Sequence, residues 1–259
     1  AHRVVWSLGT LAVLLLATGA VSARTKVLRP TTVRTCLSAA ILIAINWLTY
    51  IWAVTTGYIV EASLGYFITP LVSVALGVLV LRERLRPTQW TAVGIATSGL
   101  AVLTWSTGTL PWIALVLASS FGVYGLVKKR APLGPLDGLS VETGLLFLPA
   151  VGVIVWGGLG DTSSLQTSWT GLFLLGSTGV MTVLPLALFA TSVQRIPLAH
   201  AGLIQYLAPT LQFFLGVFVY EEPFGPAELG GYALVWTAVV IFAGEGLRAS
   251  RQHLADGDA

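Results

Sequence analysis

Two stretches of sequence decide the fold: GYFITPLVSVALGVLVLRERLRP at residues 65–87 and IQYLAPTLQFFLGVFVYEEPFGP at residues 204–226. Pro209 follows Pro70 by 139 residues, and the shared Leu-Gly-Val, Val, Glu and final Pro keep the same offset. The charges differ, because three arginines close the first stretch and two adjacent glutamates close the second. One motif is therefore written twice with its charge reversed, which indicates an internal duplication.

The composition predicts a membrane protein. Of 259 residues, 55% are hydrophobic and only 10% are charged, whereas a soluble domain carries about one quarter charged residues. A helix that spans a bilayer needs about 20 mostly apolar residues, and runs of this kind recur along nearly the whole chain. We expect nine spanning helices, at residues 4–22, 36–56, 59–81, 88–106, 110–127, 139–159, 169–190, 198–220 and 227–247.

The same offset relates whole helices. It places the first four expected spans over the sixth to the ninth and leaves the fifth, at 110–127, without a partner. We therefore expect an all-α polytopic membrane protein of two inverted five-helix repeats, with its first helix missing from this chain. A first repeat would occupy residues 1–106, a second would occupy 110–247, and 248–259 would form a cytoplasmic tail. The rival interpretation of 4–22 as a secretory signal would break this symmetry.

The basic residues predict the orientation. Every Lys and Arg except Arg3 falls on one set of alternate connectors, which the positive-inside rule assigns to the cytoplasm. A repeat with five spans inverts its second copy, so the loop after 59–81 is cytoplasmic and the loop after 198–220 is external. The charge reversal follows, with arginines in the first loop and Glu221-Glu222 in the second. Inverted repeats of this kind are typical of secondary transporters.

Five segments resemble a known family: HRVVWS (2–7), NWLTYIWAV (46–54), EASLGYFITPL (61–71), SFGVYGLVKKR (120–130) and QYLAPTL (205–211). They resemble the EamA branch of the drug/metabolite transporter superfamily along essentially the whole chain. The resemblance implies ten helices in two inverted EamA repeats, a permease of the bacterial cytoplasmic membrane, and export of its substrate. Thr69 departs from the family, because the resemblance implies Asn before Pro70.

Pro70 and Pro209 lie about halfway along their expected spans. Each removes a backbone donor and should kink its helix, and the freed carbonyl must find a partner inside the membrane. A single proline favours a packing kink, but two related by the repeat are as consistent with lining a transport path.

Polar and aromatic residues gather near the two prolines and in the second span. The expected substrate-binding set is Asn46, Trp47, Tyr50, Glu61, Tyr66, Thr69, Gln205 and Tyr206. Aromatic faces with a few hydrogen-bonding groups are typical of small-molecule sites. For each residue the alternative is a bond between helices.

Glu61 has two interpretations. It either caps its helix at the membrane interface or serves as a gate or proton-carrying acid beside the cavity. The other acids suggest structural roles: Glu142 and Glu228 should cap helix starts, and Glu245 should pair with Arg248. Lys128, Lys129 and Arg130 should mark topology and contact anionic lipid.

The sequence lacks the motifs of several classes of function. There is no phosphate loop, no His-x-x-x-His pair and no Gly-x-Ser-x-Gly elbow, and the single Cys36 excludes an intramolecular disulfide and a Cys-based zinc cluster. We expect that the protein is not an enzyme and that it binds no cofactor, metal or nucleic acid. The predicted function is a secondary carrier for a small amphipathic molecule in the lipid bilayer, with a homodimer left open. A passive channel and a non-transporting sensor or assembly protein are the alternatives.

Overall fold

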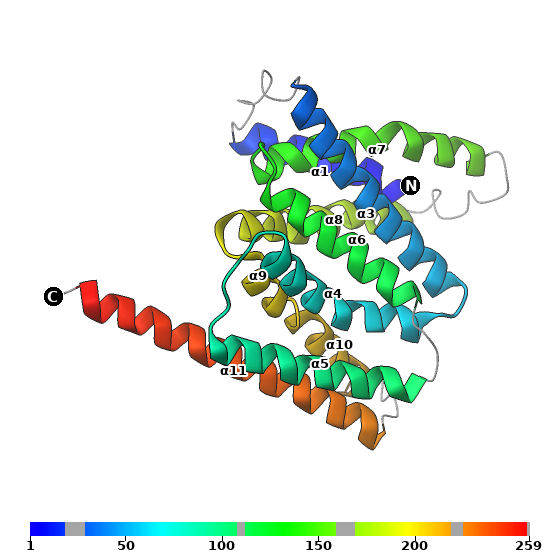
Figure 1. Ribbon diagram of the computed structural model, residues 1–259. Helices are drawn as coiled ribbons and strands as arrows, with labels where there is room; N and C mark the ends of the chain where they lie inside the picture. The colour runs from blue at the N-terminus through cyan, green and yellow to red at the C-terminus, as the bar shows by residue number, and fades with distance from the viewer. Residues whose placement is uncertain (19–28, 108–111, 159–168, 219–224, 258–259) are drawn as a thin grey trace. The chain divides into compact units, whose positions relative to one another are not determined.

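The described part of the chain is helical throughout. The structure is a computed structural model (Figure 1), and it describes residues 1–18, 29–107, 112–158, 169–218 and 225–257. Within these ranges no residue lies in a strand. The all-α fold class expected from the sequence is confirmed at this level.

The helices follow the apolar runs. Their bounds are α1 His2–Thr18, α3 Pro30–Thr55, α4 Ile59–Leu79, α5 Pro87–Thr107, α6 Trp112–Lys129, α7 Pro135–Gly158, α8 Trp169–Arg195, α9 Leu198–Ile204, α10 Leu207–Phe218 and α11 Pro226–Gly257. Four of them begin at a proline, which suits the first helical position because an N–H there would have no partner inside the helix.

Five of the described helices are long and apolar enough to cross a membrane. They are Pro30–Thr55, Ala62–Leu79, Trp112–Lys129, Pro135–Trp156 and Trp169–Arg195. Two shorter apolar helices, His2–Ala17 and Leu229–Glu245, overlap the first and last expected spans. Nine spans are therefore not confirmed, and the expected span at 198–220 is divided between α9 and α10.

Large apolar side chains cover the outside of these helices. Trp105, Trp156 and Trp169 are 90%, 83% and 88% exposed, and each lies near a helix end. An exposed surface of this kind suits contact with lipid, and tryptophan is enriched where a helix meets the membrane interface.

The chain forms two compact units. Unit 1 comprises residues 1–44 and 127–195, and unit 2 comprises residues 45–126 and 196–259. Each unit therefore takes helices from both predicted repeats.

In unit 1, α1 packs against α7 and α8. A Cβ at Gly179 would overlap the backbone carbonyl of Trp6, and the Trp6 ring also lies over Gly176. One turn along, the Arg3 Nε donates a hydrogen bond of 2.5 Å to the Thr182 hydroxyl. Small residues on α8 thus let the two helices approach closely, which is how helices associate where lipid removes the hydrophobic driving force.

In unit 2, α5 and α11 lie side by side (Figure 1). They meet at two glycines, because a Cβ on Gly99 would lie 2.8 Å from the Gly231 carbonyl oxygen. A Cβ on Gly231 would lie 2.5 Å from Leu103 Cγ. Buried residues of α4, α5, α6, α9 and α11 complete one apolar core around this contact.

We expect Gly231→Ala to destabilise the protein by about 1–3 kcal/mol, because the added methyl group overpacks the α5–α11 contact. The adjacent Gly230→Ala is the matched control, since its Cβ meets nothing within 4 Å and alanine favours the helix. Thermal unfolding in detergent should show a lower midpoint for Gly231→Ala alone. Equal midpoints for the two variants would contradict the close contact.

Candidate functional site

The expected eighth span is broken at Gln205 and Tyr206, between α9 and α10. Pro209 contributes to the break, because it has no N–H for the Gln205 carbonyl and its ring would clash with that carbonyl in a regular helix. A proline alone is not sufficient, since α4, α7 and α8 continue through Pro70, Pro149 and Pro185. The Gln205 carbonyl instead accepts from the Ala208 N–H at 3.1 Å, and the Gln205 N–H donates to the Gly202 carbonyl at 3.0 Å. Where the sequence predicted a kink at Pro209, the structure has a break one turn earlier.

Pro70 behaves differently, since α4 continues through it without interruption. The Thr69 hydroxyl donates to the Gly65 carbonyl at 2.7 Å, a bond within the helix. The structure brings this region next to the broken helix, because α4 contacts both α9 and α10. A Cβ on Gly202 would lie 2.8 Å from the Pro70 carbonyl oxygen and 2.7 Å from Ser73 Cβ.

Tyr206, at the break, is fully buried in the apolar core of unit 2. Its hydroxyl has no hydrogen-bond partner among the described residues, and neither does the buried hydroxyl of Ser73. An unsatisfied buried polar group costs about 1–3 kcal/mol, so each such group in a folded protein needs an explanation. A ligand that approaches the break is one explanation for Tyr206.

Asn46 bonds to a neighbouring helix. Its side-chain amide donates to the Leu117 carbonyl at 2.9 Å and to the Ser120 hydroxyl at 3.0 Å, both on α6. This is the helix-to-helix bond that the sequence left open as the alternative for Asn46. Ser120 was not among the predicted site residues, because the sequence of an apolar helix does not show which neighbouring helix a serine faces.

Two of the expected aromatic residues meet edge to face. The ring centroids of Tyr50 and Tyr66 lie 6.0 Å apart at 74°. Trp47 is half-buried on the same helix as Tyr50, and the Gln205 amide donates back to the Ala201 carbonyl at 3.4 Å. The Glu61 side chain, like Glu221, Glu222, Glu228 and Arg248, lies outside what the structure describes.

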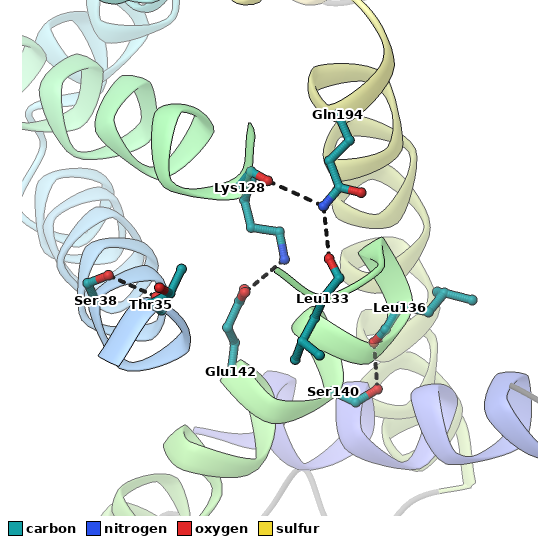
Figure 2. Close-up of polar contacts among 8 residues, drawn as sticks. All are labelled: Thr35, Ser38, Lys128, Leu133, Leu136, Ser140, Glu142 and Gln194. Atoms are coloured by element: carbon teal, nitrogen blue, oxygen red, sulfur yellow. Dashed lines mark hydrogen bonds and ion pairs between the residues drawn. The ribbon is translucent and has the colours of Figure 1, made fainter. Parts of the chain in front are cut away.

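A separate polar cluster in unit 1 was not predicted from the sequence (Figure 2). Lys128 and Glu142 point toward one another and form an ion pair of 2.7 Å, with side chains only 1% and 3% exposed. The expectation that Glu142 caps its helix is wrong, because α7 begins at Pro135 and Glu142 lies two turns inside it. Lys128 is likewise buried rather than directed to lipid. A lysine at the end of one span and an acid inside the next was the signal for this pair.

Backbone contacts close the same cluster. The Gln194 amide on α8 donates to the carbonyls of Lys128 and Leu133 at 3.3 and 3.1 Å, as Figure 2 shows. The neighbouring Lys129 ammonium donates to the Val193 carbonyl at 3.1 Å. The ends of α6 and α8 and the start of α7 are therefore tied by charged and amide groups.

Two carboxylates, those of Glu245 and Glu83, bond to neighbouring helices in unit 2. The Arg86 guanidinium pairs with Glu245 at 2.7 Å, and the Gln89 amide donates to the same carboxylate at 2.9 Å. Glu245 thus bonds to residues at the start of α5, and the predicted pair with Arg248 lies outside the described residues. Glu83, which carried no predicted role, accepts hydrogen bonds from two backbone N–H groups of α9.

Comparison with known proteins places this architecture in a family. The model of the EamA-like transporter family matches residues 2–105 and 110–244. The chain belongs to this family. The resemblance seen in the sequence is thereby confirmed, and the chain is a membrane protein with several transmembrane helices.

Individual relatives agree with the EamA-like assignment. The chain is 46% identical to protein RarD of Streptomyces exfoliatus, over 98% of this chain and 82% of that protein. It is 44% identical to the uncharacterized transporter YojE of Bacillus subtilis, over 83% and 73% of the two chains. RarD of Escherichia coli is 37% identical over 97% and 86%. Because the family and YojE are named as transporters, the expectation that the chain is not an enzyme is confirmed.

One solved crystal structure supports the fold of this EamA-like chain. It aligns over 93% of this chain and 98% of its own, with a TM-score of 0.55 and 17% identity. At this identity the likeness concerns the fold alone.

We expect Lys128→Met to destabilise the protein by about 3–5 kcal/mol, because it leaves the Glu142 carboxylate buried without its cation. The double variant Lys128→Met/Glu142→Leu should recover much of the loss, since an apolar pair can replace a buried ion pair at little cost. Thermal unfolding measures both.

The adjacent lysine supplies the control for Lys128. Lys129 is less buried than Lys128 and its ammonium donates to the Val193 carbonyl, so Lys129→Met should cost less than Lys128→Met. A double variant no more stable than Lys128→Met would show that the buried pair does not account for the loss.

Proposed function

We propose that this EamA-like protein is a secondary carrier that moves a small amphipathic metabolite or drug-like molecule across the bacterial cytoplasmic membrane by alternating access. Two inverted repeats, at residues 1–106 and 110–247, rock around a site near the membrane midplane. Transport is outward, and the chain ends in the cytoplasm. The two separate matches of the family model, the repeated proline motif and the bacterial relatives support the proposal.

The broken helix carries this proposal. Transporters bind substrate where a spanning helix is interrupted, because the interruption exposes backbone groups that water, a neighbour or a ligand must satisfy. Here the break at Gln205 and Tyr206 lies in the unit that holds the proline-bearing α4, which contacts both halves of the broken helix. The Tyr206 hydroxyl is buried there with no partner among the described residues.

The substrate-binding set remains the one the sequence suggested. Tyr66 and Thr69 lie on α4, and Gln205 and Tyr206 lie at the break between α9 and α10, both of which contact α4. Tyr50 reaches this group through its contact with Tyr66. Asn46 and Trp47 would shape the wall beside Tyr50, with Asn46 positioned by α6. Glu61 would gate the path or carry a proton.

A comparison of metabolites tests the proposal and identifies the substrate in one experiment. Mass spectrometry compares intracellular and released metabolites from cells that express the complete protein, Asn46→Ala, Glu61→Gln or an empty vector. A compound class released only with the unaltered protein is the substrate. If all four cultures match across varied growth media, transport is contradicted and the sensor alternative gains support.

Counterflow in proteoliposomes then distinguishes the carrier from a channel. Vesicles are loaded with unlabelled substrate and labelled substrate is added outside. A carrier then accumulates the label transiently above its outside concentration, because each outward step with unlabelled substrate returns the site to bind a labelled molecule. Equilibration without a transient overshoot would indicate a passive channel instead.

We expect Tyr206→Phe to leave thermal stability unchanged or slightly raised, because it removes a hydroxyl that no described residue bonds. Release of the identified substrate should fall at equal protein level, since the ligand loses a partner. Tyr58→Phe is the control, because Tyr58 is exposed at the start of α4, outside the break. Loss of stability with undiminished release would assign Tyr206 to packing alone.

A further inference from the structure

Glu83 makes an unusual contact with the first turn of α9. Its two carboxylate oxygens accept from the backbone N–H groups of Leu198 and Ala199, at 2.7 and 2.9 Å. The first N–H groups of a helix have no partner inside the helix, and a carboxylate also complements the helix dipole. Because the acceptor is charged, these bonds are stronger than ordinary ones. We call this contact, formed by Glu83, Leu198 and Ala199, the α9 latch.

The connector after α4 is shaped to present this carboxylate. Arg82 has φ of 56°, a left-handed conformation rare for a residue with a side chain. The Glu83 N–H then donates to the Gly77 carbonyl at 3.0 Å. A Cβ on Gly77 would lie 2.5 Å from a Glu83 carboxylate oxygen and 3.0 Å from the Ala199 nitrogen. Glycine at 77 is therefore a condition of the α9 latch.

Beyond its first turn, α9 is a separate short element. It has seven residues, with Pro197 before it and the break at Gln205 and Tyr206 after it. Its side packs against α4, where Gly202 faces Ser73, and the His200 ring meets the Phe242 ring edge to face at 5.1 Å. A segment bounded at both ends can move as one piece about the break.

We propose that Glu83 is a positioning residue for transport, which holds α9 against α4 and keeps the region around Ser73 and Tyr206 closed. Release of the α9 latch lets α9 swing about Gln205 and Tyr206 and opens that region from the side of the α4–α5 connector. The substrate path would thus be gated by a carboxylate that lies in a loop and bonds to backbone groups of α9. This inference rests on the proposed carrier function.

Ser73 is a reporter that needs no substrate. It is 1% exposed and its hydroxyl has no partner among the described residues, so Ser73→Cys breaks no described side-chain bond. In a Cys36→Ser background it is the only cysteine. The experiment measures how fast a charged methanethiosulfonate reagent modifies it in the protein reconstituted in lipid nanodiscs, which exposes both membrane faces.

We expect Glu83→Gln to raise the modification rate at least about tenfold, the factor that corresponds to about 1.4 kcal/mol. Glutamine keeps one acceptor oxygen but places an NH₂ group against the second backbone N–H. Gly77→Ala should produce the same increase by displacing the carboxylate. Asp137→Asn is the control, because Asp137 is an acid in the first turn of α7, in unit 1, and takes no part in the α9 latch.

A second cysteine separates opening at α9 from general loosening. Native Cys36 is 2% exposed and belongs to unit 1, so its modification in the otherwise unaltered chain should not change with Glu83→Gln. An unchanged Ser73→Cys rate in Glu83→Gln would overturn the proposal, and so would an equal increase at Cys36.

The two proposals fail separately. If counterflow succeeds and the Ser73→Cys rates are equal, the carrier stands without the latch. If the rates differ and no substrate is moved, α9 opens but transport is contradicted.

Discussion

A backbone group inside a bilayer has no water to bond, so every carbonyl and N–H group must find its partner within the protein. Nearly all of the described chain meets the constraint with uninterrupted helix. The exception inside an expected span is the segment before Pro209, where short-range bonds from the N–H groups of Ala208 and Gln205 replace the regular ones. The proposed binding site and the α9 latch depend on this interruption, because it places a buried tyrosine and a short separate helix next to α4.

Helices approach one another closely in both units, because glycines at the contacts carry no side chain. Gly179 receives the Trp6 backbone in unit 1, while Gly99 and Gly231 join α5 to α11 in unit 2. Gly202 and Gly77 let α9 lie against α4 and its connector. Helices in lipid gain little from burying leucine against leucine, so contact between backbones supplies much of the attraction.

The sequence was sufficient for the fold class, the family and the order of the helices, because apolar runs and the repeated proline motif are local signals. It predicted a proline effect at Pro209 but not its form, since a kink and a break use the same residues and differ in how the neighbours satisfy the Gln205 carbonyl. The sequence showed that the Asn46 amide needs a partner, but that partner on α6 lies 71 residues away. Charged residues were harder still: only the structure shows that α7 begins two turns before Glu142 and that Glu245 bonds to Arg86, 159 residues away. Pairing over such distances depends on which helix faces pack together, and periodicity alone does not give that.

The buried pair of Lys128 and Glu142 has a consequence for how the protein is made. The two residues are 14 positions apart and lie on consecutive helices. Lys128 lies in the last turn of α6, in the basic segment that the sequence assigns to the cytoplasmic side, so its ammonium group can stay in water until α7 is in place. Burying either charge alone is costly. The ammonium group and the carboxylate should therefore leave water together, and α6 and α7 should reach their packed arrangement as one hairpin.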